Sequence, residues 1–409
     1  MSDQMSLMQD YKKIKDLGLN LNIQRGQPAD GNFDICNGLL DALDTSELVT
    51  PSGIAIRNYP GGPAGLKEAR EILSEIISVN PEECIAGNNS SLKMLSNLIM
   101  WAMVKGVKDS PEAWSKGEPS IIVTVPGYDR HFTLLETAGI DMISVKMQGD
   151  GPDLDKIEEL AADKNIKGLV FVPVYSNPTG ETISAEKAER LASMKTAAPD
   201  FTIFADNAYA VHHLEFPHAQ APNLLEACKK AGNPDRIWLF GSTSKITFSG
   251  AGIGIMGASE ANIAWYLKLL TTQFIGPDKI NQYRHVRFIK AFPGGIEGIM
   301  KKHAEILKPK FDAVHEILEK NLGGTGLAFW TDPKGGYFVS LDTSKPVASR
   351  VVELMNEAGV TLTPAGATFP YKKDPDNSNI RIAPTRLPLA DLKKAMEILC
   401  LCIKIASAE

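Results

Sequence analysis

Short apolar runs alternate with amphipathic helical stretches through the middle of this 409-residue chain. Parallel strands that are buried on both faces read as continuous apolar runs, and helices connect them. The pattern therefore predicts an α/β fold built on a mainly parallel sheet. The expected strands are residues 121–125, 142–147, 169–174, 201–205, 237–240 and 254–257, with helices such as 131–138 and 184–195 between them.

A second pattern begins after Phe292-Pro-Gly-Gly295. Apolar residues recur at helical spacing from Ile296 to Leu318, which predicts one long helix, kinked at Pro309, that links a large domain to a smaller α+β domain. In the smaller domain we expect strands at 336–341 and 380–383 and helices at 347–357 and 389–403. The expected parts are residues 1–48, an N-terminal segment packing with the small domain, 49–292, the large domain, and 293–409, the small C-terminal domain.

Composition excludes several classes of protein. The net charge of −6 and the absence of a basic tract argue against nucleic-acid binding. The start of the chain does not resemble a signal peptide, and no apolar run is long enough to cross a membrane. Five scattered cysteines favour a reducing compartment, so we expect a cytoplasmic protein. Cys400 and Cys402 are interpreted as buried thiols of a helix rather than a metal or redox pair.

Lys245 and Asp206 are the strongest candidates for chemistry. Lys245 is the last residue of Ser242-Thr-Ser-Lys, a segment that directly follows an apolar strand. Desolvation there would lower the pKa of the lysine, so that its neutral amine could form an imine with an aldehyde. Asp206 follows another apolar strand, where a carboxylate can keep a ring nitrogen protonated. Pyridoxal phosphate requires both groups. Tyr209, three residues after Asp206, could hydrogen-bond the ring oxygen. The alternatives are a solvated lysine, an aspartate that caps a helix and a tyrosine of the core.

Other residues complete a possible cofactor site. A phosphate needs N–H groups at a helix start and nearby hydroxyls, and these are supplied by Asn89, Ser90, Ser91, Ser242 and Ser244. Asn177, in a turn after a strand, could donate to a ring oxygen. The alternatives are an ordinary Asn/Ser helix cap and an ordinary turn.

Two aromatic and two basic residues have candidate roles beside this site. Tyr128 could lie against a planar ring, and His131 could hydrogen-bond Asp206, although a core histidine fits nearly as well. Arg381 lies in an apolar strand, where its fork suits a substrate carboxylate or a structural ion pair. Arg386 could meet a second carboxylate or only solvent.

Gly252-Ile-Gly-Ile-Met-Gly257 matches the glycine pattern of dinucleotide-binding sites. That fingerprint requires the glycines to follow a strand and open a helix. Here they follow a Ser/Lys/Thr loop, and 254–257 is itself an expected strand. We therefore do not interpret the motif as a dinucleotide site.

Taken together, these motifs resemble the fold-type I, class I pyridoxal-phosphate aminotransferases over essentially the whole chain. Within that family the chain resembles the MocR-type aminotransferase subgroup, some of whose members are aspartate aminotransferases. The subgroup motifs are Gly87-Asn-Asn-Ser-Ser-Leu, Ile275-Gly-Pro-Asp-Lys-Ile-Asn-Gln, His285-Val-Arg-Phe, His303-Ala-Glu-Ile-Leu-Lys-Pro-Lys-Phe and Pro333-Lys-Gly-Gly-Tyr-Phe. The resemblance implies a large domain with a seven-stranded, mainly parallel sheet and a smaller α+β domain.

The resemblance also implies a role for each matching residue. Lys245 would form the Schiff base and move the proton, and Asp206 would pair with the pyridinium nitrogen. Tyr209 and Asn177 would contact the ring oxygen, with Tyr128 stacked on the ring. Ser90 and Ser242 would bind the phosphate, and Arg381 would bind the α-carboxylate of the substrate. Tyr59 matches a tyrosine that reaches the partner subunit's phosphate, which implies a homodimer with shared sites, and Gly26 matches a segment that closes over substrate.

The chain departs from the family pattern in two places. Ile253 stands where an arginine usually neutralises the phosphate. Residues 271–274 lack the arginine with which typical aspartate aminotransferases bind the distal carboxylate, so Arg386, Arg284 and Arg287 are candidates for that role.

The expected function is ping-pong transamination from an amino acid, with L-aspartate favoured, to a 2-oxo acid such as 2-oxoglutarate. The alternatives are an alanine–glyoxylate aminotransferase, a pyridoxal-phosphate lyase or decarboxylase, and a MocR-type ligand-sensing domain. The last requires a DNA-binding winged helix ahead of the domain, and here the catalytic-type domain begins within the first few dozen residues.

Overall fold

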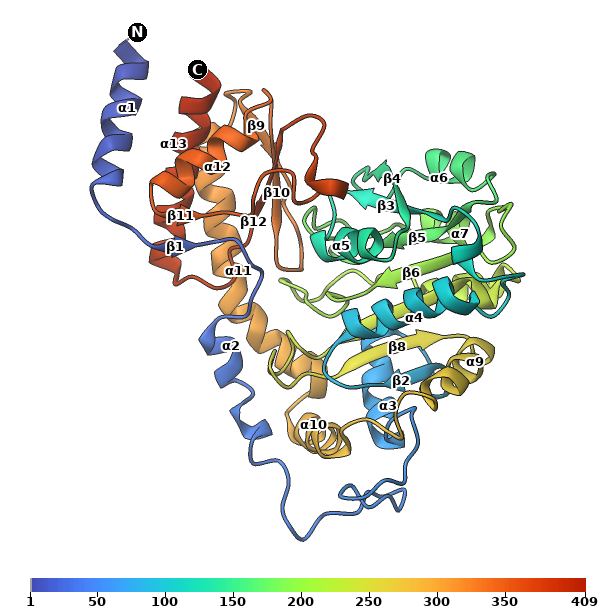
Figure 1. Cartoon of the computed structure of the whole chain (residues 1–409). Helices are drawn as coiled ribbons and strands as arrows, with labels where there is room; N and C mark the ends of the chain where they lie inside the picture. The colour runs from blue at the N-terminus through green and yellow to red at the C-terminus, as the bar shows by residue number, and fades with distance from the viewer. Residues whose placement is uncertain (1) are drawn as a thin grey trace.

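The computed structural model describes residues 2–409, and side chains from residue 5 onward. A seven-stranded sheet forms the centre of the larger part (Figure 1), in the order β2-β8-β7-β6-β5-β3-β4. The strands are β2 (Cys84–Ala86), β8 (Gly254–Ala258), β7 (Ile237–Ser242), β6 (Thr202–Asp206), β5 (Ile166–Phe171), β3 (Ser120–Val125) and β4 (Asp141–Lys146). Strand β8 runs antiparallel to both neighbours, and the pairs from β7 to β4 are parallel. The predicted mainly parallel α/β sheet is confirmed.

Each of the six predicted strands is present, with ends that differ from the prediction by up to three residues, most of all in β5, which begins and ends three residues earlier than expected. The strand expected at 169–174 ends at Phe171, because Pro173 has no N–H to donate to a neighbouring strand. Strand β2 was not predicted, since three residues are too few to show a pattern.

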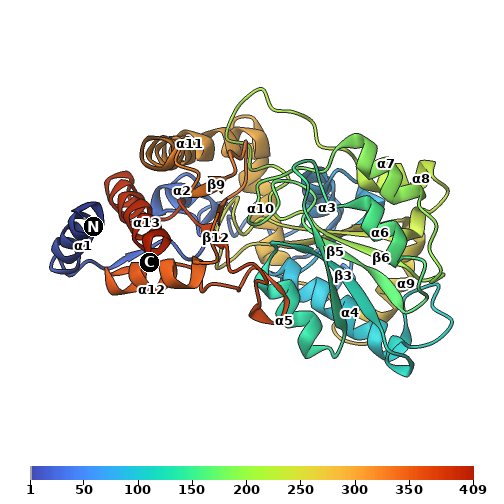
Figure 2. The same cartoon turned by 90° about the horizontal axis from the view of Figure 1, so that it is seen from above.

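Helices cover both faces of this sheet (Figure 2). One face packs against α3 (Lys67–Leu73), α6 (Leu154–Leu160), α7 (Ala185–Ser193) and α8 (Leu224–Lys230), and the other against α4 (Ser91–Lys105), α5 (Asp129–Thr137) and α9 (Glu260–Leu270). Alternate residues of one strand enter the two cores: Leu239 lies on the first face, Trp238 and Phe240 on the second. Burial on both faces explains why the strands read as unbroken apolar runs.

The smaller part contains a three-stranded antiparallel sheet in the order β12-β10-β9. Its strands are β9 (Ala328–Trp330), β10 (Val339–Thr343) and β12 (Asn379–Ile382), and its helices are α11 (Gly295–Leu322), α12 (Ala348–Glu357) and α13 (Leu389–Ala408). Helix α11 follows α10 (Lys279–Ala291) and continues across Pro309 as one helix, which confirms the predicted long helix, while the kink at Pro309 stays a prediction.

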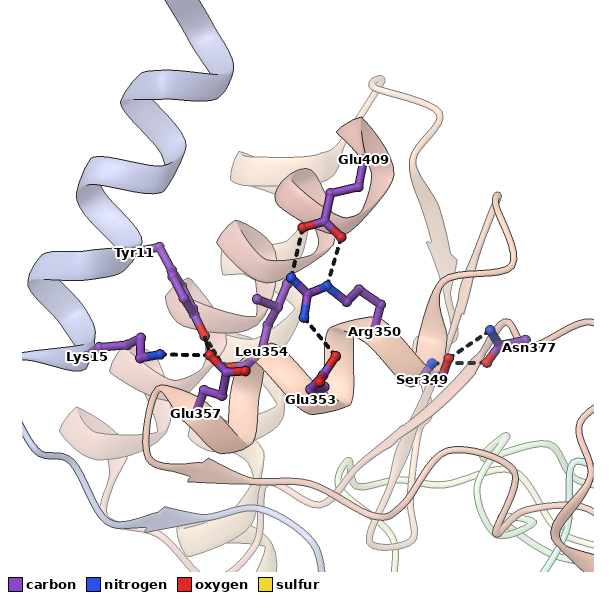
Figure 3. A network of polar contacts seen from close by, with 9 residues as sticks. All are labelled: Tyr11, Lys15, Ser349, Arg350, Glu353, Leu354, Glu357, Asn377 and Glu409. Carbon is purple, nitrogen blue, oxygen red and sulfur yellow. Dashed lines mark hydrogen bonds and ion pairs between the residues drawn. The ribbon is translucent and has the colours of Figure 1, made fainter.

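The N-terminal segment packs on this smaller part. Helix α1 (Ser2–Lys15) lies beside α12 and α13 (Figure 3), where the Tyr11 hydroxyl donates to the Leu354 carbonyl at 2.8 Å and Lys15 pairs with Glu357 at 2.7 Å. Arg350 of α12 pairs with Glu409 at the end of the chain at 2.8 Å. Strand β1 (Leu21–Asn22) pairs with β11 (Val360–Thr361), and α2 (Asp30–Asp34) follows. The N-terminal segment therefore contacts the smaller part. The division into residues 1–48, 49–292 and 293–409 stays a prediction, and residue 1 lies outside the described residues.

Residues 2–409 contain no membrane-spanning helix, no cluster of metal ligands and no disulfide bond. No helix in this range is long and apolar enough to cross a membrane. No cluster of three or more potential metal ligands was found there. All five cysteines are buried and unpaired, which confirms the interpretation of Cys400 and Cys402 as buried thiols.

Candidate active site

The predicted site residues converge where the parallel strands end. Loops after β3, β5, β6 and β7 bring Tyr128, Asn177, Tyr209 and Lys245 to one edge of the sheet, as expected for a parallel α/β sheet. These four residues line a cavity of about 490 Å³. The smaller part and the N-terminal segment complete the cavity with Arg381 and Gly26, so six of the predicted residues share one space.

Lys245 is half-buried beside Tyr209, whose ring centroid lies 5.0 Å from the lysine Nζ atom. Burial lowers the pKa of Lys245 below its ordinary value of 10.5, while the Asp206 carboxylate acts in the opposite direction. Because desolvation disfavours the ammonium form, the amine is poised to act as a nucleophile or base.

Asp206, the last residue of β6, is buried at 5% exposure. Its Oδ2 atom lies 2.9 Å from His131 Nε2, so the predicted contact between these side chains is present. The other carboxylate oxygen, Oδ1, is buried and has no hydrogen-bond partner. Such an oxygen is costly unless a donor meets it, and a protonated ring nitrogen is a donor of the required kind.

Two tyrosines flank the lysine and the aspartate. Burial raises the pKa of Tyr209 well above its usual value, so its phenol stays protonated and able to donate a hydrogen bond. Burial raises the pKa of Tyr128 to about 12, and this ring meets the His131 ring edge-on at a centroid distance of 5.0 Å. Both are present as neutral phenols at physiological pH.

Hydroxyl hydrogen bonds and a close approach of two backbone segments bring together the serines that are expected to bind phosphate. The Ser242 hydroxyl donates to Ser244 Oγ at 2.6 Å and accepts from the Ser244 N–H at 2.9 Å. Ser90 caps α4 by accepting from the Lys93 N–H at 3.1 Å. The two groups meet at Gly254, which pairs with Ser242 between strands and whose added Cβ would lie 2.7 Å from the Ser90 carbonyl carbon.

This contact gives the glycine motif at 252–257 a structural role. A Cβ on Gly252 would lie 2.6 Å from Ser244 Oγ, so both glycines allow the hydroxyl loops to approach closely. Strand β8 begins at Gly254, so the last two glycines of the motif lie within a strand rather than in a turn between a strand and a helix, which agrees with our rejection of a dinucleotide site. Ser91 opens α4 beside Ser90, and Asn89 is exposed in the preceding loop.

Arg381 lies in β12 with 7% exposure and faces the cavity. Its Nη1 atom donates to Asp129 Oδ1 at 3.0 Å and to Asn177 Oδ1 at 3.4 Å. Its Nε atom donates to Thr363 Oγ1 at 3.2 Å, and its guanidinium carbon lies 4.9 Å from the centre of the Phe338 ring. Arg381 therefore forms an ion pair with Asp129 and also lines the cavity, so its position is compatible with both alternatives from the sequence, a structural ion pair and a substrate carboxylate.

The N-terminal segment reaches the cavity at Gly26. A Cβ at this position would lie 2.5 Å from Phe338 Cζ, so only glycine lets the backbone pass this ring closely. Adjacent hydrogen bonds tie the segment to the smaller part: Thr363 Oγ1 donates to the Gln24 carbonyl at 3.0 Å, and Thr385 Oγ1 to the Gln27 carbonyl at 2.6 Å.

Several candidates lie elsewhere. Arg386 is exposed and outside the cavity lining. Arg287 pairs with Glu47 at the surface, and Arg284 donates to Asn281 at 3.0 Å. Tyr59 is 71% exposed and outside this cavity. Ile253 is fully buried in the apolar core, so this position contributes no charge.

The cavity wall also contains charged residues that the sequence reasoning missed. They are Arg25, Asp129, Arg130, Glu136 and Lys372. Asp129 and Arg130 lie between the two predicted residues Tyr128 and His131, and Arg25 adjoins Gly26, so proximity to a motif was the available signal. Arg25 and Arg130 supply cations in the cavity wall, whereas Arg386, Arg284 and Arg287, the candidates from sequence for a distal carboxylate, are not among the lining residues.

Comparison with known proteins identifies the family. The family model described as "Aspartate amino-transferase" matches residues 2–409. An aspartate aminotransferase of Corynebacterium glutamicum is 42% identical over 400 residues, covering 98% of this chain and 92% of the relative. A Mycolicibacterium smegmatis protein named as an aminotransferase is 46% identical over 407 residues, covering 98% and 94%.

A solved structure shows the same architecture. The crystal structure of an aspartate transaminase from Corynebacterium glutamicum superimposes with a TM-score of 0.96 at 42% identity, covering 99% of this chain and 95% of that one. The match confirms the fold-type I architecture that the motifs implied. The chain belongs to the aspartate aminotransferase family of pyridoxal-phosphate-dependent aminotransferases.

Proposed function

We propose that this aminotransferase moves the amino group of L-aspartate to 2-oxoglutarate, and that it belongs to the MocR-type aminotransferase subgroup. The observation that carries the catalytic assignment is the arrangement of Lys245 and Asp206. A desolvated amine and a buried carboxylate with one unpartnered oxygen lie at the same edge of the sheet. The aspartate specificity rests on the 42% identity to a relative named for it, and the subgroup rests on the motifs at 87–92, 275–282 and 285–288.

The residues fit pyridoxal phosphate. Lys245 would bind its aldehyde carbon, Asp206 its ring nitrogen, and Tyr209 and Asn177 its ring oxygen, with Tyr128 against the ring. The hydroxyls of Ser90, Ser91, Ser242 and Ser244, the Asn89 loop and the N-terminus of α4 would receive the phosphate. When bound, the cofactor withdraws the electrons released as the substrate's α-proton leaves.

The chain's own residues then perform three tasks. Lys245 accepts the α-proton from the amino acid and returns a proton during transfer, a role for which its lowered pKa is suited. His131 holds the Asp206 carboxylate in place. Arg381 orients the substrate through its α-carboxylate. Hydrolysis releases a 2-oxo acid, and a second oxo acid reverses the sequence.

The remaining expectations are also proposals. We propose a cytoplasmic homodimer in which exposed Tyr59 reaches the phosphate of the partner subunit's site, and in which Gly26 belongs to a segment that closes over substrate. Residues 49–292 would form the cofactor-binding domain. Arg25 and Arg130 replace Arg386 as candidates for a distal carboxylate, because they line the cavity.

A half-reaction tests the proposed function. Cofactor-loaded protein mixed with L-aspartate alone should release oxaloacetate and convert the cofactor to pyridoxamine phosphate, and 2-oxoglutarate should then yield glutamate. An alanine–glyoxylate enzyme would respond to alanine in the same panel instead. A lyase or decarboxylase would leave the cofactor as pyridoxal phosphate with release of ammonia or carbon dioxide. Inactivity with every amino donor, combined with specific binding in a DNA shift assay, would favour the ligand-sensing alternative.

A further inference from the structure

Arg381 has a carboxylate partner before any substrate arrives. Asp129 Oδ1 lies 3.0 Å from Arg381 Nη1, and both side chains line the cavity. The two residues come from different parts of the molecule, Asp129 from the start of α5 and Arg381 from β12. The pair therefore connects the larger part to the smaller part directly across the site.

In this pair, Asp129 binds the Arg381 guanidinium, the same group that we propose binds the α-carboxylate of the substrate. A guanidinium binds a carboxylate best through two parallel N–H···O bonds. The Nε atom of Arg381 is already committed to Thr363, and Nη1 is committed to Asp129. A substrate carboxylate that binds Nη1 must displace Asp129. A substrate carboxylate that binds only the remaining N–H groups of the guanidinium lies close to the negative charge of Asp129, which repels it.

Asp129 is able to leave this contact. Its side chain is 37% exposed, whereas that of Arg381 is 7% exposed. It is also the first residue of α5, where the free N–H groups of the helix stabilise a carboxylate. Asp129 can thus retain favourable interactions after it separates from Arg381, while a buried Arg381 without an anion would be costly.

We propose that Asp129 is a positioning residue: it pairs with Arg381 in the substrate-free site, holds the guanidinium in place, and is displaced by the carboxylate of the substrate. This inference rests on the proposed role of Arg381. A carboxylate ligand can then use the full guanidinium only in molecules in which the Asp129–Arg381 pair is open. The pair therefore lowers the apparent affinity for every carboxylate ligand. It also prevents a buried, uncompensated cation between turnovers.

The test is the affinity of cofactor-loaded protein for propionate, a ligand with a single carboxylate, measured by titration calorimetry. Asp129→Asn keeps an oxygen that can accept from Arg381 but removes the competing charge. The dissociation constant should fall about three- to tenfold. If Asp129 only supported the structure of Arg381, the same variant would bind propionate equally or more weakly, and either result would overturn the proposal.

Glu136→Gln is the matched control. Glu136 lies on the same helix, is exposed and lines the same cavity, so its replacement removes one negative charge without touching the pair. Its propionate affinity should change by less than about twofold; a fall equal to that of Asp129→Asn would show a general charge effect and overturn the proposal. Asp129→Ser, which suits a helix start and is too short to bridge to Arg381, should change the affinity in the same direction if Asp129→Asn does not fold.

Turnover distinguishes this inference from the proposed function. In Asp129→Asn the KM for aspartate should fall in the same direction as the dissociation constant of propionate. If wild-type protein transaminates a different amino acid, the aspartate assignment fails while the propionate result still decides the role of Asp129.

Discussion

The buried Oδ1 atom of Asp206, which has no hydrogen-bond partner, indicates where a protonated ring nitrogen would bind. One carboxylate oxygen is held by His131, and the other is buried without a donor. We predict that Asp206→Asn lowers kcat by about 10²-fold or more, because an amide cannot stabilise a protonated ring nitrogen. His131→Asn, which keeps the negative charge of Asp206, should cost much less. Steady-state rates and the cofactor spectrum of both variants test this difference, and equal losses would contradict the assignment.

Single residues also show where prediction from sequence stops. Lys245, Asp206 and Arg381 could be found because each stands at the end of, or within, a recognisable apolar strand. The pair between Asp129 and Arg381 joins residues 252 positions apart, and no local pattern encodes such a contact. Arg386 is a second example: it follows Arg381 closely in the chain, but it is not among the residues that line the cavity.

At the scale of elements, the phosphate end depends on how closely β8 passes the start of α4. Gly254→Ala would place a methyl group 2.7 Å from the Ser90 carbonyl carbon, and this is backbone that cannot rotate away. We predict a loss of about 1–3 kcal/mol in stability and weaker binding of pyridoxal phosphate. Urea denaturation and a cofactor titration measure the two effects.

Gly250→Ala is the control for this substitution. An added Cβ at Gly250 meets no atom within 4 Å, so stability and cofactor affinity should stay near those of the wild type. If Gly254→Ala behaved like this control, the close approach of the two loops would not matter for the site.

The order of elements was largely predictable, whereas their exact ends were not. Long helices and buried strands carry a strong periodic or continuous apolar pattern, as in α11 and β7. Strand β2 and the early end of β5 depend on pairing partners and on a single proline. The assembly of the serine loops depends on tertiary contacts through Gly254, which the sequence showed only as an unexplained glycine motif.

At the scale of the whole molecule, buried neutral histidines make stability depend on pH. Burial lowers the pKa of His285 to about 4 from 6.5, and that of His303 also to about 4. The imidazole of His285 is held between the Asn281 carbonyl at 2.8 Å and the Thr247 hydroxyl at 2.9 Å, contacts that suit a neutral ring. The unfolded chain binds more protons than the folded protein between these two pKa values.

The histidine contribution to stability is therefore present above pH 6.5 and is lost as the pH falls toward 4. We predict that the free energy of unfolding decreases over this window. His285→Gln should reduce the proton uptake on unfolding at pH 5 by about one proton. Urea denaturation at a series of pH values measures this uptake, and an unchanged slope in the variant would contradict the assigned state of His285.

The central claim is that Lys245 forms the covalent bond to pyridoxal phosphate, and its most direct test is chemical. Purified protein is loaded with the cofactor, reduced with borohydride, digested and analysed by mass spectrometry. We predict a phosphopyridoxyl adduct on Lys245, absent in Lys245→Ala together with the visible absorbance of the lysine-bound cofactor. An adduct on another lysine, or no adduct at all, would contradict the claim.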